Sequence, residues 1–229
     1  FFNKVREIRS FESSELVASA VSREFWFNDY VVKLSSSHHK VGVRGDCLNI
    51  GKTAYTVANY FYDELVSIRP SERFEFFNNQ DFFQTLAPGF KIQKPFFPLR
   101  DNNQPRNNIV FFIGGSEEYK RWNVNFFARL AIDLSREYPK LNPIICGGKG
   151  DQEDASRFER LFNLEASGKI KNEVGKTTLV DLVSIMSRTE VLISNETSAP
   201  HIAVAANVPC VYVITNGGIA KRFTPYPKE

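Results

Sequence analysis

The sequence predicts an α/β protein whose second half is a doubly wound domain built on a parallel sheet. Two observations lead to this fold class. After residue 105, apolar runs of four to six residues alternate with segments whose apolar residues recur at helical spacing. The runs are apolar throughout, as expected of strands that are buried on both faces of a parallel sheet.

The second half carries this pattern in full. We expect strands over 108–113, 143–146, 191–194 and 209–214. We expect helices over 123–138, 153–164, 177–188 and around 200–207. Glycines or small polar residues follow the first three strands directly, so the turns that lead into the helices are visible in the sequence.

The first half carries fewer strands than its helices require. We expect helices over 11–24, 53–67 and 71–87, the last capped by Ser71, and one strand over 40–44. The segment 93–108 contains three prolines and a polar run, which predicts a linker. The predicted domains are therefore residues 1–105 and 106–229. The only methionine is Met186, and we expect the first domain to be incomplete at its N-terminus.

Composition excludes several classes of protein. The 229 residues include 29 Lys+Arg and 26 Asp+Glu, for a net charge of +3, and neither half has a basic stripe of the kind that binds nucleic acid. No apolar run approaches the length of a membrane span. Cys47, Cys146 and Cys210 are far apart and form no C-x-x-C pair, which predicts reduced, buried thiols in an intracellular protein.

Three loops that follow predicted strands are candidate binding sites, because ligands of open parallel sheets bind outside the carboxyl ends of the strands. In the first loop, Gly115 and Ser116 follow the strand and Lys120 offers a cation suited to phosphate. The alternative is an ordinary loop with surface charges. In the second loop, Gly148 and Asp151 either hold a ribose or cap the following helix.

The third loop leads from a buried strand into a helix that has proline near its start. Glu196, Thr197 and Ser198 lie where free N–H groups and small hydroxyls form an anion site. His201 either donates to a phosphate or is a satisfied core histidine.

Two other short motifs do not indicate a phosphate or metal site. The two Gly-Lys-Thr triplets at 51–53 and 175–177 lack the earlier glycine that a phosphate-binding P-loop needs. His38 and His39 have no third metal ligand at a suitable spacing, so we expect no metal site.

Taken together, the three loops resemble the second domain of glycosyltransferase family 9, the heptosyltransferase family of bacterial lipopolysaccharide synthesis. The matching stretches are GGS at 114–116, KRW at 120–122, GGKGD at 147–151, GKTTL at 175–179 and SNETSAPHIAVAANVP at 194–209. The last stretch is the most specific, and the match covers about half of the chain.

The resemblance implies a GT-B fold, with an acceptor-side first domain and a second domain that holds the nucleotide-sugar. It implies an inverting transferase with ADP-heptose as donor, a lipid-linked or lipopolysaccharide acceptor, and no cofactor or obligatory metal. It further implies a cytoplasmic protein with peripheral contact to the inner face of the membrane. By position, Lys120 contacts the diphosphate or ribose, Asp151 holds the ribose, and Thr177 caps its helix.

The general base of the family is an aspartate near the start of the first domain, which we expect in a segment before Phe1. Asp29 and Asp46 are candidates by location only, and neither is assigned. Two residues depart from the family pattern: Glu196 replaces Asp, and Ala199 replaces Gly and adds a methyl at the ligand edge. These departures keep two alternatives open, a UDP- or GDP-sugar donor and a degenerate protein that binds nucleotide or glycan without transfer.

Overall fold

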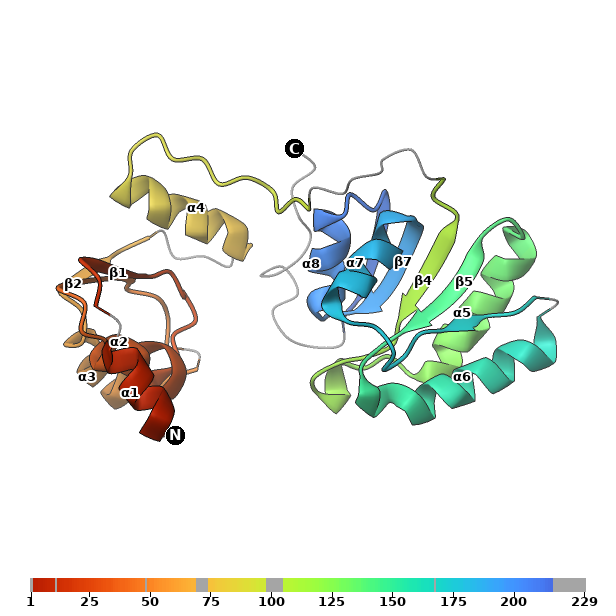
Figure 1. The fold of residues 1–229 in the computed structure, drawn as a ribbon, viewed down its shortest axis with the longest axis horizontal. Helices are drawn as coiled ribbons and strands as arrows, with labels where there is room; N and C mark the ends of the chain where they lie inside the picture. The colour runs from red at the N-terminus through yellow and green to blue at the C-terminus, as the bar shows by residue number, and fades with distance from the viewer. Residues whose placement is uncertain are drawn as a thin grey trace. The chain divides into compact units, whose positions relative to one another are not determined.

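The computed structural model describes residues 2–10, 12–47, 49–68, 74–97, 105–166 and 168–215. The chain divides into two compact units between Gln93 and Lys94, at the start of the segment that the sequence marks as a linker. Each unit is an α/β unit with its own parallel sheet (Figure 1). Over the described ranges, no helix is long and apolar enough to cross a membrane.

The second unit contains a five-stranded parallel sheet in the order β6-β5-β4-β7-β8. The strands are β4 (Asn108–Phe112), β5 (Asn142–Cys146), β6 (Lys171–Asn172), β7 (Thr189–Asn195) and β8 (Cys210–Ile214). In the centre of the sheet, Phe111 of β4 pairs with Ile145 of β5 on one side and Ile193 of β7 on the other. The order reverses at β4, so the carboxyl ends of β5, β4 and β7 are neighbours at one edge.

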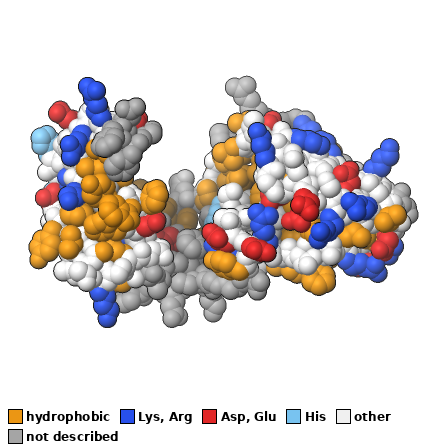
Figure 2. Space-filling model, turned by 90° about the horizontal axis from the view of Figure 1, so that it is seen from below, with side chains coloured by type: hydrophobic (Ala, Val, Ile, Leu, Met, Phe, Trp, Pro, Cys, Tyr) orange, Lys and Arg blue, Asp and Glu red, His pale blue; other side chains and the backbone are white. Residues whose placement is uncertain are grey.

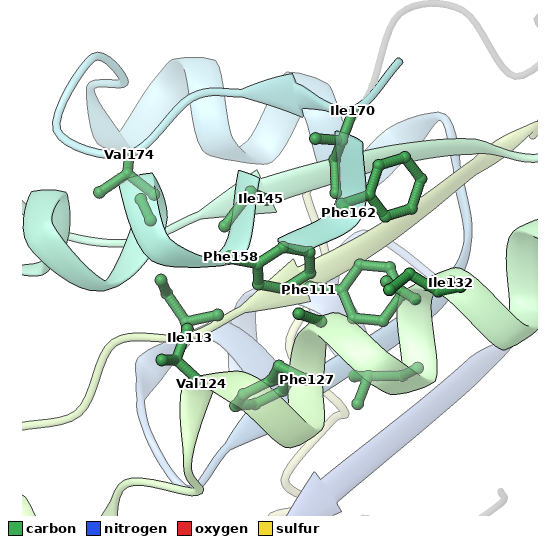
Figure 3. Close-up of a cluster of buried hydrophobic side chains, with 14 of the residues drawn as sticks. Phe111, Ile113, Val124, Phe127, Ile132, Ile145, Phe158, Phe162, Ile170 and Val174 are labelled. Atoms are coloured by element: carbon green, nitrogen blue, oxygen red, sulfur yellow. The ribbon is translucent and has the colours of Figure 1, made fainter. Parts of the chain in front are cut away.

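Helices cover both faces of this sheet, which confirms the doubly wound prediction. The helices are α5 (Val124–Glu137), α6 (Gln152–Glu165), α7 (Leu179–Ser187) and α8 (Ser198–Ala205). On one face, Phe127 of α5 and Phe158 of α6 pack with Phe111 in a fully buried cluster (Figure 3). On the other face, Leu182 and Met186 of α7 pack with residues of α8 and the alternate strand residues.

The eight expected elements of this unit differ from the observed ones by two residues or fewer at each end. Asn123 caps α5 by accepting the N–H of Asn125. The cap of α7 is Thr178, whose hydroxyl accepts the N–H of Asp181, so the predicted cap at Thr177 is wrong by one residue. Strand β6 was not predicted, because a strand of two residues is too short to show a periodic pattern.

The first unit contains a three-stranded parallel sheet in the order β1-β2-β3. Its strands are β1 (Glu15–Ala18), β2 (His39–Val43) and β3 (Glu64–Val66). Its helices are α1 (Phe2–Ser10), the π-helical turn η1 (Phe25–Asp29), α2 (Tyr30–Leu34), α3 (Lys52–Asn59) and α4 (Glu75–Leu86). Val41, Val43 and Phe82 lie in its small buried core.

Three expectations for this unit need correction. The predicted helix over 11–24 is wrong, because Glu15–Ala18 pairs with β2 as strand β1. The predicted helix over 53–67 ends at Asn59, and its last residues form β3, which also pairs with β2. The third predicted helix begins at Glu75, and its expected cap Ser71 lies outside the described residues. In each strand, pairing with a distant segment outweighs the local apolar pattern.

All three cysteines are free thiols, but only one fits the prediction of burial. Cys146 at the end of β5 is fully buried, whereas Cys47 is exposed and Cys210 is half-buried. Burial raises the pKa of the Cys146 thiol to about 12, so this thiol stays protonated at neutral pH.

Candidate functional site

The predicted site residues lie at one edge of the second unit's sheet. Gly115, Ser116 and Lys120 follow β4, Gly148 and Asp151 follow β5, and Glu196 and Thr197 follow β7, with Ser198 and His201 in the first turn of α8. Because β5, β4 and β7 are adjacent and parallel, the fold brings all three loops together.

A clamp formed by Arg121 and Asp151 joins the first two loops. Nη1 of Arg121 lies 2.6 Å from Oδ1 of Asp151, and Nη2 donates to the carbonyl of Gly115 at 2.6 Å. The second carboxylate oxygen accepts the N–H of Gly148 at 2.7 Å. The Asp151 side chain is 6% exposed and that of Arg121 is 32% exposed. The carboxylate therefore organises both loops from within.

Two glycines make room for this carboxylate. A Cβ at Gly114 would lie 2.7 Å from Oδ2 of Asp151, and one at Gly147 would lie 2.9 Å from the same oxygen. Contacts this short would push the carboxylate away. The glycines after β4 and β5 are thus explained by the approach of Asp151 rather than by a ligand alone.

Asn195 joins the first and third loops from the end of β7. Its side chain is fully buried, and its amide donates to the carbonyls of Ile113 at 2.8 Å and Gly114 at 3.2 Å. Its oxygen accepts the N–H of Trp122 at 2.9 Å. Trp122 in turn packs its ring on Phe127 of α5, with ring centroids 4.9 Å apart. The loop after β4 is therefore held from both neighbouring strands.

The start of α8 presents the features of an anion site. The Thr197 hydroxyl accepts the N–H of Ala199 at 3.2 Å, which caps the helix, while Ser198 is exposed and Glu196 is half-buried. Burial lowers the pKa of His201, so its imidazole is neutral at pH 7. Ala199 is fully buried in the cluster beneath α8. Its methyl therefore lies in the core, and the expectation that it sits at the ligand edge is wrong.

Lys120 ends a short 3₁₀ turn, η2 (Glu118–Lys120), in the loop after β4. Its ammonium lies 5.7 Å from the centre of the Tyr119 ring, and the side chain is half-buried. Ser116 in the same loop is exposed. Lys120 supplies positive charge and the capped start of α8 supplies N–H donors, a combination that suits a diphosphate.

Asp151 has its two carboxylate oxygens occupied by Arg121 and Gly148. This arrangement fits the structural alternative for the residue, with the carboxylate holding the turn that begins α6. A carboxylate oxygen has two lone pairs, so a ribose hydroxyl remains a predicted partner in addition.

Of the two aspartate candidates of the first unit, Asp46 is half-buried and Asp29 is enclosed by partners. Asp29 is fully buried, and its Oδ1 accepts from Nε of Arg23 at 2.9 Å and from the Tyr62 hydroxyl at 2.7 Å. The Arg23 guanidinium lies 4.9 Å from the ring centres of both Tyr55 and Tyr62. Burial, and then the hydrogen bond to Asp29, raises the pKa of Tyr62. Asp29 is thus a partner of a buried cation and is not accessible to an acceptor hydroxyl.

Sequence reasoning missed the two residues that connect the loops. Arg121 directly follows Lys120. Its partner Asp151 lies thirty residues further along the chain, so the spacing of the two residues does not indicate that they pair. Asn195 did leave a signal. An amide at the end of a buried strand needs partners, because buried polar groups are nearly always hydrogen-bonded.

The chain is similar in sequence to two heptosyltransferases of Campylobacter. Lipooligosaccharide heptosyltransferase 2 of Campylobacter jejuni is 28% identical over 94 residues, which are 41% of this chain and 29% of that protein. Lipopolysaccharide heptosyltransferase 1 of Campylobacter coli is 21% identical over 225 residues, covering 93% of this chain and 60% of that protein.

The fold is also found among solved structures. The Escherichia coli heptosyltransferase WaaC with ADP-2-deoxy-2-fluoro heptose aligns with a TM-score of 0.66 at 13% identity, covering 99% of this chain and 67% of that one. The two units are therefore those of a GT-B fold. The chain spans less than a third of the first curated relative and about two thirds of this structure.

A family model matches residues 71–226, which are well over half of the chain and include all three loops of the site. The chain belongs to glycosyltransferase family 9, the heptosyltransferase family.

Proposed function

We propose that the protein transfers a heptose-like sugar from ADP-heptose to a lipopolysaccharide core or a related glycan. The observation that carries this proposal is the convergence of Lys120, the capped start of α8 and the clamped glycine turns at one sheet edge. The relatives from Campylobacter carry the name heptosyltransferase, and WaaC was solved with an ADP-linked heptose analogue, which supports this donor.

The proposed chemistry follows from charge. Cleavage of the sugar–phosphate bond leaves a nucleoside diphosphate with growing negative charge. The Lys120 ammonium and the N–H groups at the start of α8 would stabilise that charge in the absence of a metal. An acceptor hydroxyl would attack the anomeric carbon and invert it, with a carboxylate as general base. No described residue is assigned as this base.

A second candidate, nucleotide or glycan binding without transfer, depends on Glu196. This residue follows β7 where the family pattern has Asp, and the extra methylene brings its carboxylate further from the backbone. The burial of Ala199 removes the other reason for a weakened site. A third candidate is transfer from a UDP- or GDP-sugar bound at the same site.

We also propose cytoplasmic, peripheral contact with the membrane through an aromatic patch on the first unit, defined as Phe25, Trp26, Phe27, Tyr30 and Phe61. Trp26 is 69% exposed and Phe27 is 71% exposed, and the ammonium of Lys33 lies 4.9 Å from the Phe61 ring centre. Hydrophobic side chains gather on this unit in Figure 2. Aromatic rings with a nearby cation are typical of surfaces at the lipid–water interface.

The aromatic patch has a simple test. A double change, Trp26→Ala with Phe27→Ala, should reduce co-sedimentation with vesicles containing phosphatidylglycerol. Tyr138→Ala is the control, because Tyr138 is 49% exposed but lies in the other unit. Equal binding by both variants would reject the patch and leave the transfer proposal untouched.

A transfer assay tests the main proposal. The protein is incubated with ADP-heptose and heptose-free lipopolysaccharide core, and ADP release is measured with and without EDTA. We expect release that survives EDTA and falls at least about tenfold in Lys120→Ala, since a hydrogen bond to a charged group contributes roughly 1.5–3 kcal/mol. Lys140→Ala, an exposed lysine in the same unit, is the matched control. ADP binding without release would favour the binding-only alternative.

A further inference from the structure

A groove beside α7 collects cations. Lys169 and Arg188 lie at its far end, just before strands β6 and β7, whereas Lys176 lies beside the glycine turn after β5. One face of α7, the amino ends of β4 and β5, and strand β6 line the groove, and it encloses about 680 Å³. Its charged residues, here called the basic groove, are Lys169, Lys171, Glu173, Lys176, Asp181 and Arg188. Because the whole chain is close to charge balance, four cations against two acids is a local excess.

The two acids are already engaged. Glu173 accepts from the Lys171 ammonium at 2.7 Å. Asp181 accepts from the hydroxyl of Thr178 at 2.7 Å and from its N–H at 2.9 Å, and these bonds hold the pKa of Asp181 below its usual value. Both carboxylates are thereby committed to their own neighbours and are poor partners for the remaining cations.

The remaining cations line the groove and have unused hydrogen-bond donors. Within the described residues, the side chains of Lys169 and Arg188 have neither a hydrogen bond nor an ion pair, and both are exposed. Lys176 uses one donor on the carbonyl of Asn172 at 2.7 Å. The amides of Asn108 and Asn142 add neutral donors along the wall. Lysine and arginine beside neutral donors are the usual surroundings of bound phosphate.

The polar lining of the basic groove does not suit a packed helix. Apart from Pro143, Ile144 and Ile185, the groove is lined by polar or charged residues. A hollow of similar size beside β8, about 670 Å³, is lined largely by apolar residues such as Leu134, Val191 and Ile193. A packed helix would suit the second hollow, whereas a hydrated, charged ligand suits the first.

We propose that the basic groove binds a phosphate-bearing ligand of about the size of a sugar phosphate, held chiefly by Lys169 and Arg188 at the end that faces away from the loops of the nucleotide site. The volume lies within the range of roughly 300–1,000 Å³ of small-molecule pockets and is far larger than one phosphate needs. The phosphate could belong to a soluble phosphorylated saccharide or to a lipid headgroup. The proposal holds whether or not the protein transfers heptose.

Titration calorimetry of the full chain, carried out without ADP and again at saturating ADP, provides the test. One arm uses inositol hexakisphosphate as a soluble phosphate probe, and the other uses vesicles of phosphatidylcholine with phosphatidylglycerol. The test variant is Lys169→Glu with Arg188→Glu. A second variant, Lys169→Gln with Arg188→Gln, removes charge without reversing it. The matched control is Arg157→Glu with Arg160→Glu, two exposed arginines of α6.

We expect binding in at least one arm, weakened about tenfold or more in both groove variants and little changed in the control, as the loss of charged hydrogen bonds implies. The arm that responds identifies the source of the phosphate. Three results would overturn the proposal: no binding in either arm, an equal loss in the control, or displacement of the probe by ADP.

Discussion

Replacing Asp151 with alanine removes the carboxylate at the centre of the clamp. The change breaks the ion pair to Arg121 and the bond to the N–H of Gly148. Among the described residues, the guanidinium then keeps the carbonyl of Gly115 and the more distant Asp154 as partners. If the clamp orders the loops after β4 and β5, the second unit should lose stability well beyond the effect of one surface charge.

The magnitude follows from burial. Breaking one side of a fully buried ion pair costs roughly 3–5 kcal/mol. Here the acid is buried but the Arg121 side chain is 32% exposed, so water can rehydrate the guanidinium. We therefore expect a loss of about 2–3 kcal/mol in the free energy of unfolding. For a unit of this size, each kcal/mol lowers Tm by roughly 3–5 °C, which gives a fall of about 6–15 °C.

Asp154→Ala is a matched control for this experiment. Asp154 lies in the first turn of α6, three residues after Asp151, is 42% exposed and stands 4.0 Å from the same guanidinium. Its removal changes the net charge by the same amount. An exposed pair of this kind contributes at most about 0.5 kcal/mol. Differential scanning calorimetry of both variants measures the contrast. Melting temperatures for the two variants within about 2 °C of each other would refute the clamp, given the sensitivity stated above.

Binding by the same variant separates two roles of Asp151. If the clamp acts only by holding the loops in place, Asp151→Ala should weaken the binding of ADP and the binding of pyrophosphate by the same factor. If the carboxylate also holds the ribose, ADP should lose more affinity than pyrophosphate, which has no ribose.

Two further predictions concern packing and pH. Phe158 is fully buried and lies 5.7 Å from Phe111 between ring centres, so Phe158→Ala should cost about 3–5 kcal/mol in urea unfolding, whereas Phe126→Ala, 57% exposed, should cost far less. Burial lowers the pKa of His201 below its unfolded value of about 6.5, so protonation favours the unfolded chain and stability should fall as the pH drops below that value. In His201→Gln this part of the loss between about pH 7 and 5 should disappear, and an unchanged slope of unfolding free energy against pH would contradict it.

The second unit was predictable because its local and global signals agree. Strands β4 and β5 carry apolar residues on both faces, and a glycine turn follows each of them. The first unit gave no such agreement. Glu15–Ala18 has half its residues exposed, and only its pairing with β2 makes it a strand. Such pairing is a property of the folded chain and leaves little trace in a short segment.

The site shows the same division. Parallel strands that end together explain why the three predicted loops meet, and Lys120 and Thr197 lie after β4 and β7 at that edge. The bonds that fix the loops, from Arg121 to Asp151 and from Asn195 to Ile113, connect residues far apart in the chain. Their partners depend on side-chain reach in the folded unit, which spacing along the sequence does not encode.

Nucleotide binding tests the central claim most directly. Isothermal titration of the protein with ADP, UDP and GDP should give measurable affinity for ADP above the other two, reduced about tenfold or more in Lys120→Ala and unchanged in Lys140→Ala. Preference for UDP or GDP would keep the site and change the donor. A folded protein that binds none of the three would contradict the account of this sheet edge as a nucleotide-sugar site.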